Sequence, residues 1–153
     1  MQTARQQIAA MPLRWKDGTV QVLMVTTRDT GRWVVPKGWT MKDVKPWAAA
    51  AIEALEEAGV KGVISREVFG TYSYMKALDK KKSVLCRVRV YPMIVEEEKS
   101  KWKEKGERTR KWFDVGEAAS LVDEPELADL LKSLRKKPKK VDVAGPLLRQ
   151  AIS

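Results

Sequence analysis

Three glutamates, Glu53, Glu56 and Glu57, have the residue type and spacing that could do chemistry in this chain. Because they stand at positions i, i+3 and i+4 of a helix-forming segment, their carboxylates are expected on one face of a helix. Like charges at this spacing repel, so solvent, neighbouring lysines or a bound cation must offset the repulsion. The sequence contains no histidine, and a metal site built only from oxygen donors favours Mg²⁺ or Mn²⁺. The alternative interpretation is a solvated acidic face that binds no cation.

The helix that carries these glutamates is predicted from Trp47 to Ala58. Pro46 stands where the missing N–H of proline costs a helix little, and Gly59 supplies a C-terminal stop. Four consecutive alanines at 48–51 give the helix small side chains that allow close packing against a sheet. The sequence therefore predicts a central helix, which argues against the solvated-face interpretation.

Segments rich in valine and aromatic residues predict a sheet around this helix. The predicted strands span residues 8–15, 20–27, 33–35 and 111–113, with further strands over 60–95 that include 68–74 and 83–95. Two more helices are predicted after them, one opened by Asp114 and Glu117 as an acidic capping box and one running from Asp123 to about Arg135. The expected fold class is α+β, with a mixed sheet sandwiched between the central helix and the C-terminal helices.

Length and composition predict one domain. The chain has 153 residues, and the 44% that are hydrophobic can form a core. It shows neither the roughly 18 to 20 apolar residues of a membrane span nor a secretory signal. A single cysteine, Cys86, excludes an internal disulfide and suits the cytoplasm. The domain is expected over residues 1–135, followed by a basic, mobile tail at 136–153, and the protein is expected to be a monomer or homodimer.

The net charge of +10 favours polyanionic partners through electrostatic steering. It does not identify the polyanion. Nucleic acids, nucleotide polyphosphates and inositol polyphosphates all stay open on this ground.

The segment from Gly38 to Val60 resembles the Nudix box, a 23-residue loop–helix motif. The box positions for glycine, glutamate and the last apolar residue are matched at the correct spacing by Gly38, Glu53, Glu56, Glu57, Gly59 and Val60. Ala54 is a small occupant of the internal apolar position. The run Trp33 to Gly38 also resembles the strand that leads into the box, and the similarity extends over most of residues 5–135.

Two positions depart from the box. Val44 stands where the family has its first glutamate, and Ile52 stands where it has arginine. An arginine beside three carboxylates would pair with one of them and fix its rotamer, which isoleucine cannot do. Ile52 either adds to the core face of the helix or weakens the site, and the sequence predicts that Ile52→Arg raises a metal-dependent rate.

The resemblance implies roles for individual residues. Glu53 and Glu57 would ligate Mg²⁺ or Mn²⁺, with a backbone carbonyl near Gly38 as a further ligand. Glu56 would be the catalytic residue that handles the proton of the attacking water, or another ligand. The implied reaction is hydrolysis of a phosphoanhydride bond in a phosphate-rich small molecule. The alternative is a catalytically impaired Nudix-fold protein that binds RNA or another polyanion, for which the basic run from Arg135 to Lys140 would be suited.

Basic and hydroxyl residues before the box are candidates for substrate binding. Arg28, Arg32, Lys37 and Thr27 lie on the turn and strand leading into it. In this segment the chain is similar to the Nudix branch that hydrolyses diadenosine and diphosphoinositol polyphosphates. Weaker candidates are Glu104 or Glu107, as a second-metal ligand or base, and one of Tyr72 and Tyr74, which lie on the same face of a strand.

Overall fold

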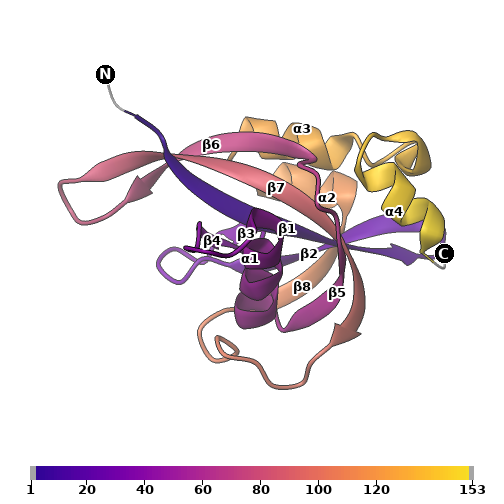
Figure 1. Ribbon diagram of the computed structural model, residues 1–153, viewed down its shortest axis with the longest axis horizontal. Coiled ribbons are helices and arrows are strands. Elements are labelled where there is room, and N and C mark those ends of the chain that lie inside the picture. Colours follow the sequence, from indigo (N-terminus) through magenta and orange to yellow (C-terminus); the bar gives the residue numbers. More distant parts are fainter. Residues whose placement is uncertain (1–2, 152–153) are drawn as a thin grey trace.

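The computed structural model describes residues 3–151 and contains one eight-stranded mixed sheet with helices on both sides (Figure 1). The strands are β1 (Arg5–Lys16), β2 (Thr19–Thr26), β3 (Trp33–Val34), β4 (Lys37–Trp39), β5 (Val60–Ile64), β6 (Gly70–Ala77), β7 (Ser83–Glu98) and β8 (Arg110–Asp114). The helical segments are α1 (Pro46–Glu53), the π-helical turn η1 (Ala54–Ala58), α2 (Val115–Leu121), α3 (Pro125–Lys132), the 3₁₀ turn η2 (Pro138–Lys140) and α4 (Ala144–Gln150). The predicted α+β class, with a mixed sheet between a central helix and C-terminal helices, is confirmed.

The two long strands β1 and β7 run parallel at the centre of the sheet, and every other pairing is antiparallel. Each long strand changes partner along its length. β1 pairs first with β4 and then with β2, while β7 pairs first with β6 and then with β5. The short strand β4 lies opposite the start of β1, with Gly38 facing Ile8. This pairing fixes the backbone that leads into α1.

Separate cores form on the two faces of the sheet. On one face, Ala49, Ala50, Ala54 and Ala58 are fully buried and let α1 and η1 approach the strands closely. The prediction drawn from the alanine run is therefore confirmed. On the other face, the side chains that α2, α3 and α4 contribute are mostly leucine and alanine. α1 thus packs on the sheet beside β4, and η1 contacts the loop that follows β7, which is where the predicted site lies.

The helix that was predicted over 47–58 begins and ends nearly as expected. Pro46 occupies its first turn, and Gly59 closes it with a left-handed φ of 68°. The last five residues, however, form the π-helical turn η1, in which the Gly59 N–H bonds to the carbonyls of both Ala54 and Leu55. Such single π turns recur at functional sites because they re-aim the side chains of a helix.

Two predictions about the C-terminal half are wrong. Residues 138–150 are not a mobile tail: η2 and α4 are ordered, Leu148 is fully buried, and the Trp15 Nε1–H donates to the Leu148 carbonyl at 3.0 Å. The capping box is also absent. Asp114 stands at the N-cap of α2, but its Oδ1 accepts from Gln21 Nε2 on the neighbouring strand at 3.3 Å instead.

The domain boundary near residue 135 stays a prediction. Among the residues that the structure describes, no helix is both long and apolar enough to cross a membrane.

Candidate active site

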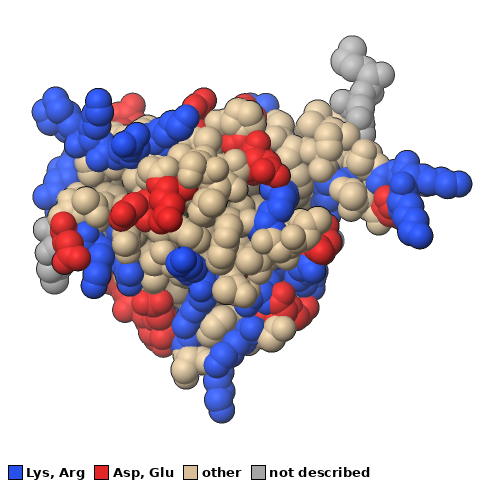
Figure 2. Space-filling view, turned by 180° about the vertical axis from the view of Figure 1, so that it is seen from behind, with Lys and Arg blue, Asp and Glu red and all other residues tan. Residues whose placement is uncertain are grey.

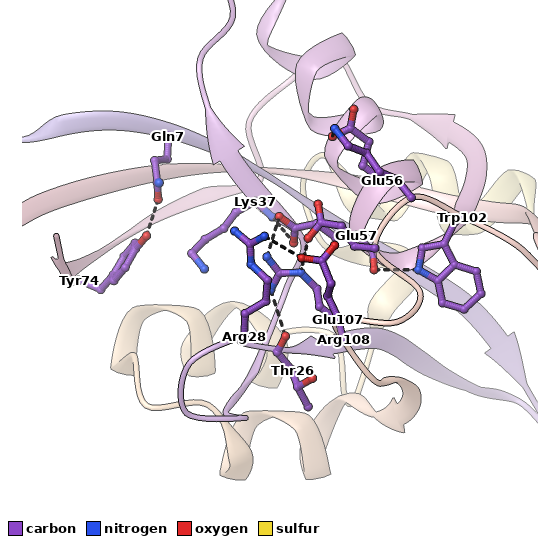
Figure 3. A network of polar contacts seen from close by, with 12 residues as sticks. Gln7, Thr26, Arg28, Lys37, Glu56, Glu57, Tyr74, Trp102, Glu107 and Arg108 are labelled. Atoms are coloured by element: carbon purple, nitrogen blue, oxygen red, sulfur yellow. Dashed lines mark hydrogen bonds and ion pairs between the residues drawn. The ribbon is translucent and has the colours of Figure 1, made fainter. Parts of the chain in front are cut away.

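Glu57 is the most tightly held carboxylate of the site (Figure 3). Its residue is 5% exposed, and its Oε1 accepts from the Lys37 backbone N–H at 3.3 Å. Its Oε2 lies 3.6 Å from an Nη of Arg108, and its carbonyl accepts from Trp102 Nε1 at 3.2 Å. Burial raises the pKa of Glu57, and the cations Arg108 and Lys37 oppose that rise. The carboxylate is therefore kept in one orientation by two other segments, the backbone at Lys37 and the guanidinium of Arg108, while Trp102 holds the backbone of the same residue.

Glu53 lies against Gly38, and this contact explains the glycine. A Cβ at position 38 would approach Glu53 Oε2 to 2.6 Å, so any other residue would displace the carboxylate. Burial raises the pKa of Glu53 to about 7, and the charges of Glu57 and Glu56 add to the effect. A cation bound beside Glu53 would offset both causes.

Glu56 points away from Glu57 (Figure 3). Its carboxylate is 33% exposed and lies 3.6 Å from Nζ of Lys103. Within residues 3–151 no three acidic side chains are close enough together to form a complete cation-binding group. Of the three glutamates, Glu53 and Glu57 line the same pocket, whereas Glu56 does not line it and pairs with Lys103 on the outer side of the helix.

The loop between β7 and β8 brings a fourth carboxylate, Glu104, to the site. Its backbone N–H donates to the Glu56 carbonyl at 3.0 Å, which fixes the loop to the helix. Its Oε1 accepts from Arg108 Nε at 2.8 Å, in a pair whose side chains are 12% and 11% exposed. The sequence indicated Glu104 as a weaker candidate. It gave no signal for Arg108, since nothing in the sequence shows where a loop arginine will point.

The donor types of one pocket suit a hard divalent cation, although its three carboxylates stand farther apart than the ligands of a bound ion would. A pocket of about 220 Å³ is lined by three carboxylates, those of Glu53, Glu57 and Glu104, and by Gly38. All of these offer oxygen donors only, which is the set that Mg²⁺ and Mn²⁺ prefer. Arg108 and Lys37 line the same pocket and partly neutralise it.

A second pocket of about 430 Å³ adjoins the carboxylates, and four predicted substrate-binding residues, Thr27, Arg28, Arg32 and Lys37, all line it. Arg28 pairs with Glu107 at 3.0 Å, which raises the pKa of this guanidinium. Burial lowers the pKa of Lys37. A buried lysine is stabilised more by a bound anion than an exposed lysine is, because the anion favours the charged form that burial disfavours.

Tyr74 and Lys76 of β6 also line both pockets, and the sequence did not single out Lys76. The Tyr74 hydroxyl donates to Gln7 Oε1 at 2.6 Å, whereas Tyr72 is 1% exposed and belongs to the core. One of the two predicted tyrosines therefore reaches the site. The pockets share five lining residues, Arg28, Lys37, Tyr74, Lys76 and Arg108, so they form one continuous depression.

The two departures from the box have different surroundings. Val44 is partly buried and packs against the α1 core. Ile52 is 36% exposed, so the interpretation that it adds to the core face of the helix is wrong. Neither residue lines the pocket that contains the carboxylates.

Comparison with known proteins identifies relatives of this arrangement. A family model described as the NUDIX domain matches residues 4–134. Nudix hydrolase 16, mitochondrial, of Arabidopsis thaliana is 34% identical over 115 residues, which cover 73% of this chain and 63% of that protein. Diphosphoinositol polyphosphate phosphohydrolase 3-beta of Bos taurus is 33% identical over 120 residues, which cover 75% and 69%. The chain spans 54% to 66% of the length of three such Arabidopsis relatives.

Solved structures share the fold at low sequence identity. The C. elegans Ap4A hydrolase in a binary complex aligns with a TM-score of 0.63 and 19% identity, covering 84% of this chain and 93% of that one. The E. coli dihydroneopterin triphosphate pyrophosphohydrolase aligns with a TM-score of 0.66 and 15% identity, covering 87% and 98%. These two matches support the architecture alone.

Proposed function

The chain belongs to the Nudix family, and from this premise we propose that it is a metal-dependent hydrolase of phosphoanhydride bonds in a nucleoside polyphosphate or an inositol pyrophosphate. The observation that carries the proposal is the continuous depression. Carboxylates line one end of it, and cations from four different segments line the rest. A substrate with several adjacent phosphates matches this layout, because its reacting phosphate can lie near the carboxylates while the others contact arginine and lysine.

The names of the relatives support this class of substrate. One relative is named a diphosphoinositol polyphosphate phosphohydrolase, and one structural neighbour is an Ap4A hydrolase. Both names denote compounds with runs of phosphates. The cations Arg28, Arg32, Lys37, Lys76 and Arg108 suit either one.

In the proposed reaction, water attacks phosphorus, the phosphoanhydride P–O bond breaks, and the electron pair leaves with the departing phosphate. Glu53, Glu57, Glu104 and the Gly38 backbone would hold Mg²⁺ or Mn²⁺, which neutralises phosphate oxygens when bound. Lys37 and Lys76 bind the flanking phosphates. The attacking water gives its proton to a carboxylate. The two candidates are Glu104, which lines the pocket, and Glu56, which stands outside it.

A substrate panel tests the proposal. The purified chain is incubated with Mg²⁺ or Mn²⁺ and with dinucleoside polyphosphates, inositol pyrophosphates, nucleotide sugars and oxidised nucleotides, and released phosphate is measured. We expect turnover of the compounds with the longest phosphate chains, and we expect Glu57→Gln to abolish it. Glu117→Gln, which removes one negative charge on α2 away from the pocket, is the control and should retain turnover. Turnover that survives chelation of the metal, or that survives Glu57→Gln, would contradict the proposed function.

A second candidate function, polyanion binding, is favoured by a basic cleft at the other end of the molecule. The cleft has a volume of about 300 Å³ and lies between Trp15, the turn at 18–20 and the segment at 135–140. Five cations line it, Arg135, Lys136, Lys137, Lys139 and Lys140, and none of them makes an ion pair within the described residues. Figure 2 shows lysine and arginine side chains gathered over this end. Nζ of Lys139 lies 5.4 Å from the Trp15 ring centroid.

Single-stranded RNA is the natural probe for this cleft, since a phosphate backbone and stacking bases match cations around an aromatic ring. Fluorescence anisotropy of a labelled oligonucleotide is measured at two salt concentrations. We expect Lys137→Glu with Lys139→Glu to weaken binding by at least about tenfold, because several phosphate contacts are lost. Lys80→Glu with Lys81→Glu, at the exposed β6–β7 turn, is the matched control. An equal loss in the control would assign the binding to general charge and reject the cleft.

A further inference from the structure

The acidic cluster needs a fixed cation that its own helix does not supply. Glu53, Glu57 and Glu104 line one small pocket, and the carboxylate charges raise the cost of keeping one another ionised. Position 52, one residue before the first of them, is an exposed isoleucine with no charge to offer. The ordering of the cluster must therefore come from another segment.

Arg108 meets this need. Its side chain is 11% exposed, and all three of its guanidinium nitrogens have partners. Nε lies 2.8 Å from Glu104 Oε1, Nη2 lies 3.6 Å from Glu57 Oε2, and Nη1 donates to the Thr26 carbonyl at 3.0 Å. The planar fork of arginine suits this task, because its rigid donors fix the direction of the carboxylates that it binds.

The loop that carries Arg108 is itself attached to the end of the helix. Trp102 donates to the Glu57 carbonyl at 3.2 Å, and Arg110 Nη1 donates to the Ala58 carbonyl at 2.9 Å. The Lys99 N–H donates to the Gly59 carbonyl at 2.7 Å. These bonds use carbonyls that a helix terminus leaves without intrahelical partners. Arg108 and the carboxylates are thus held by one connected unit.

We propose that Arg108 is the positioning residue that orders the acidic cluster in this chain, in place of an arginine at position 52. Arg108 holds the carboxylates of Glu57 and Glu104. An arginine at position 52 would instead lie one helical turn from Glu56. The inference rests on the proposed function of the pocket as a metal-dependent hydrolytic site. It explains how this chain keeps its glutamates while it lacks the box arginine.

Mn²⁺ binding without substrate, measured by isothermal titration calorimetry, tests the proposal separately from activity. Removing a positive charge would by itself strengthen the attraction between Mn²⁺ and the carboxylates, whereas losing their alignment weakens binding. We expect Arg108→Ala to weaken Mn²⁺ binding by about tenfold, as loss of a residue that orients ligands typically does. Lys101→Ala is the matched control, since Lys101 is an exposed cation of the same loop. Tighter binding in Arg108→Ala would show that Arg108 merely competes with the metal and would overturn the proposal.

A conservative variant separates positioning from charge. Arg108→Lys keeps the positive charge but loses the fork, so we expect it to restore less than half of the kcat that Arg108→Ala loses, with KM nearly unchanged. Full rescue by lysine would overturn the positioning role. If the unmodified protein binds no Mn²⁺ at all, the proposed function fails. If instead Arg108→Ala keeps normal Mn²⁺ binding and normal kcat, the proposed function stands and the positioning role of Arg108 is overturned.

Discussion

The inner side of the box helix, which faces the pocket, differs sharply from the outer side, although neighbouring residues of one motif, Glu57 and Glu56, lie on the two sides. On the inner side, Glu57 is 5% exposed and is held by Lys37, Arg108 and Trp102. On the outer side, the backbone carbonyl of Glu56 accepts from Glu104, but within the described residues its carboxylate pairs only with Lys103, whose side chain is 69% exposed. An ion pair that open to solvent contributes little free energy, whereas a buried and hydrogen-bonded carboxylate has a defined position.

This difference shows that adjacent residues of one motif do not have equal roles. Spacing alone puts Glu56 and Glu57 together on the helix surface. The π-helical turn, the loop before β8 and the strand β4 decide which of them faces the pocket. The role of each glutamate therefore depends on segments outside the helix.

The largest expected effect comes from comparing Glu57→Gln with Glu56→Gln. Loss of Glu57 removes the held carboxylate of the pocket, and we expect kcat to fall by about 10³-fold, since a bound cation supplies several kcal/mol of stabilisation to the transition state. Glu56→Gln is expected to cost about tenfold, because that carboxylate lies outside the pocket. Both rates are measured under saturating Mg²⁺. Equal losses would show that Glu56 turns inward to take the proton of the attacking water and would break the comparison.

A smaller effect is expected on stability, through Glu53 on the inner side. Its pKa in the folded protein is about 7, above the ordinary 4.5 that the unfolded chain retains. The folded state therefore binds this proton more tightly. No penalty exists below pH 4.5, and a penalty grows as the pH rises from there to 7. The metal-free protein should lose stability between pH 5 and pH 8, and Glu53→Gln should lose less.

Thermal unfolding in the presence of a chelator checks this expectation. We expect the difference in Tm between Glu53→Gln and the unmodified protein to shift in favour of the variant by about 3 °C from pH 5 to pH 8. Added Mn²⁺ at pH 8 should raise the Tm of the unmodified protein, since a ligand stabilises the state that binds it, and should do so much less in the variant. Glu117→Gln serves as the control. A Tm difference that does not change with pH would contradict the raised pKa.

Most of the fold could be predicted from the sequence because its signals are local. Pro46, the alanine run and Gly59 each act through the backbone of their own helix, and valine-rich segments form strands with neighbours close in the chain. The C-terminal helix α4 was missed for a physical reason. Its apolar residues, such as Leu148, follow a run of lysines that dominates the composition, and only tertiary packing against Trp15 makes the helix stable.

The candidate site could be predicted only in part, since much of it is built from long-range contacts. Thr27, Arg28, Arg32 and Lys37 were found because they lie near the box in sequence, and all four line the pocket. Arg108 and Lys76 reach the site through the loop before β8 and the pairing of β6 with β7, and no local pattern marks them. The interpretation of Ile52 as a core residue was wrong, because helical periodicity cannot show which side of a helix a sheet will cover.

The smallest expected effect concerns the outer side of the helix, at position 52. The sequence alone predicts that Ile52→Arg raises the metal-dependent rate. In the structure, an arginine at the 36%-exposed position 52 would lie one helical turn from Glu56 and compete with Lys103, while Arg108 already holds Glu57 and Glu104. We therefore expect kcat to change by less than about twofold, as an exposed pair contributes little.

The same substitution becomes informative when it is made together with Arg108→Ala. If ordering of the inner carboxylates depends on Arg108, an arginine at position 52 cannot restore it from the outer side, and the double variant should remain as slow as Arg108→Ala. Steady-state kinetics of the two single variants and the double variant measure the coupling directly. Recovery of most of the rate in the double variant would show that the two sides of the helix are interchangeable, and the contrast between Glu57 and Glu56 would then not decide their roles.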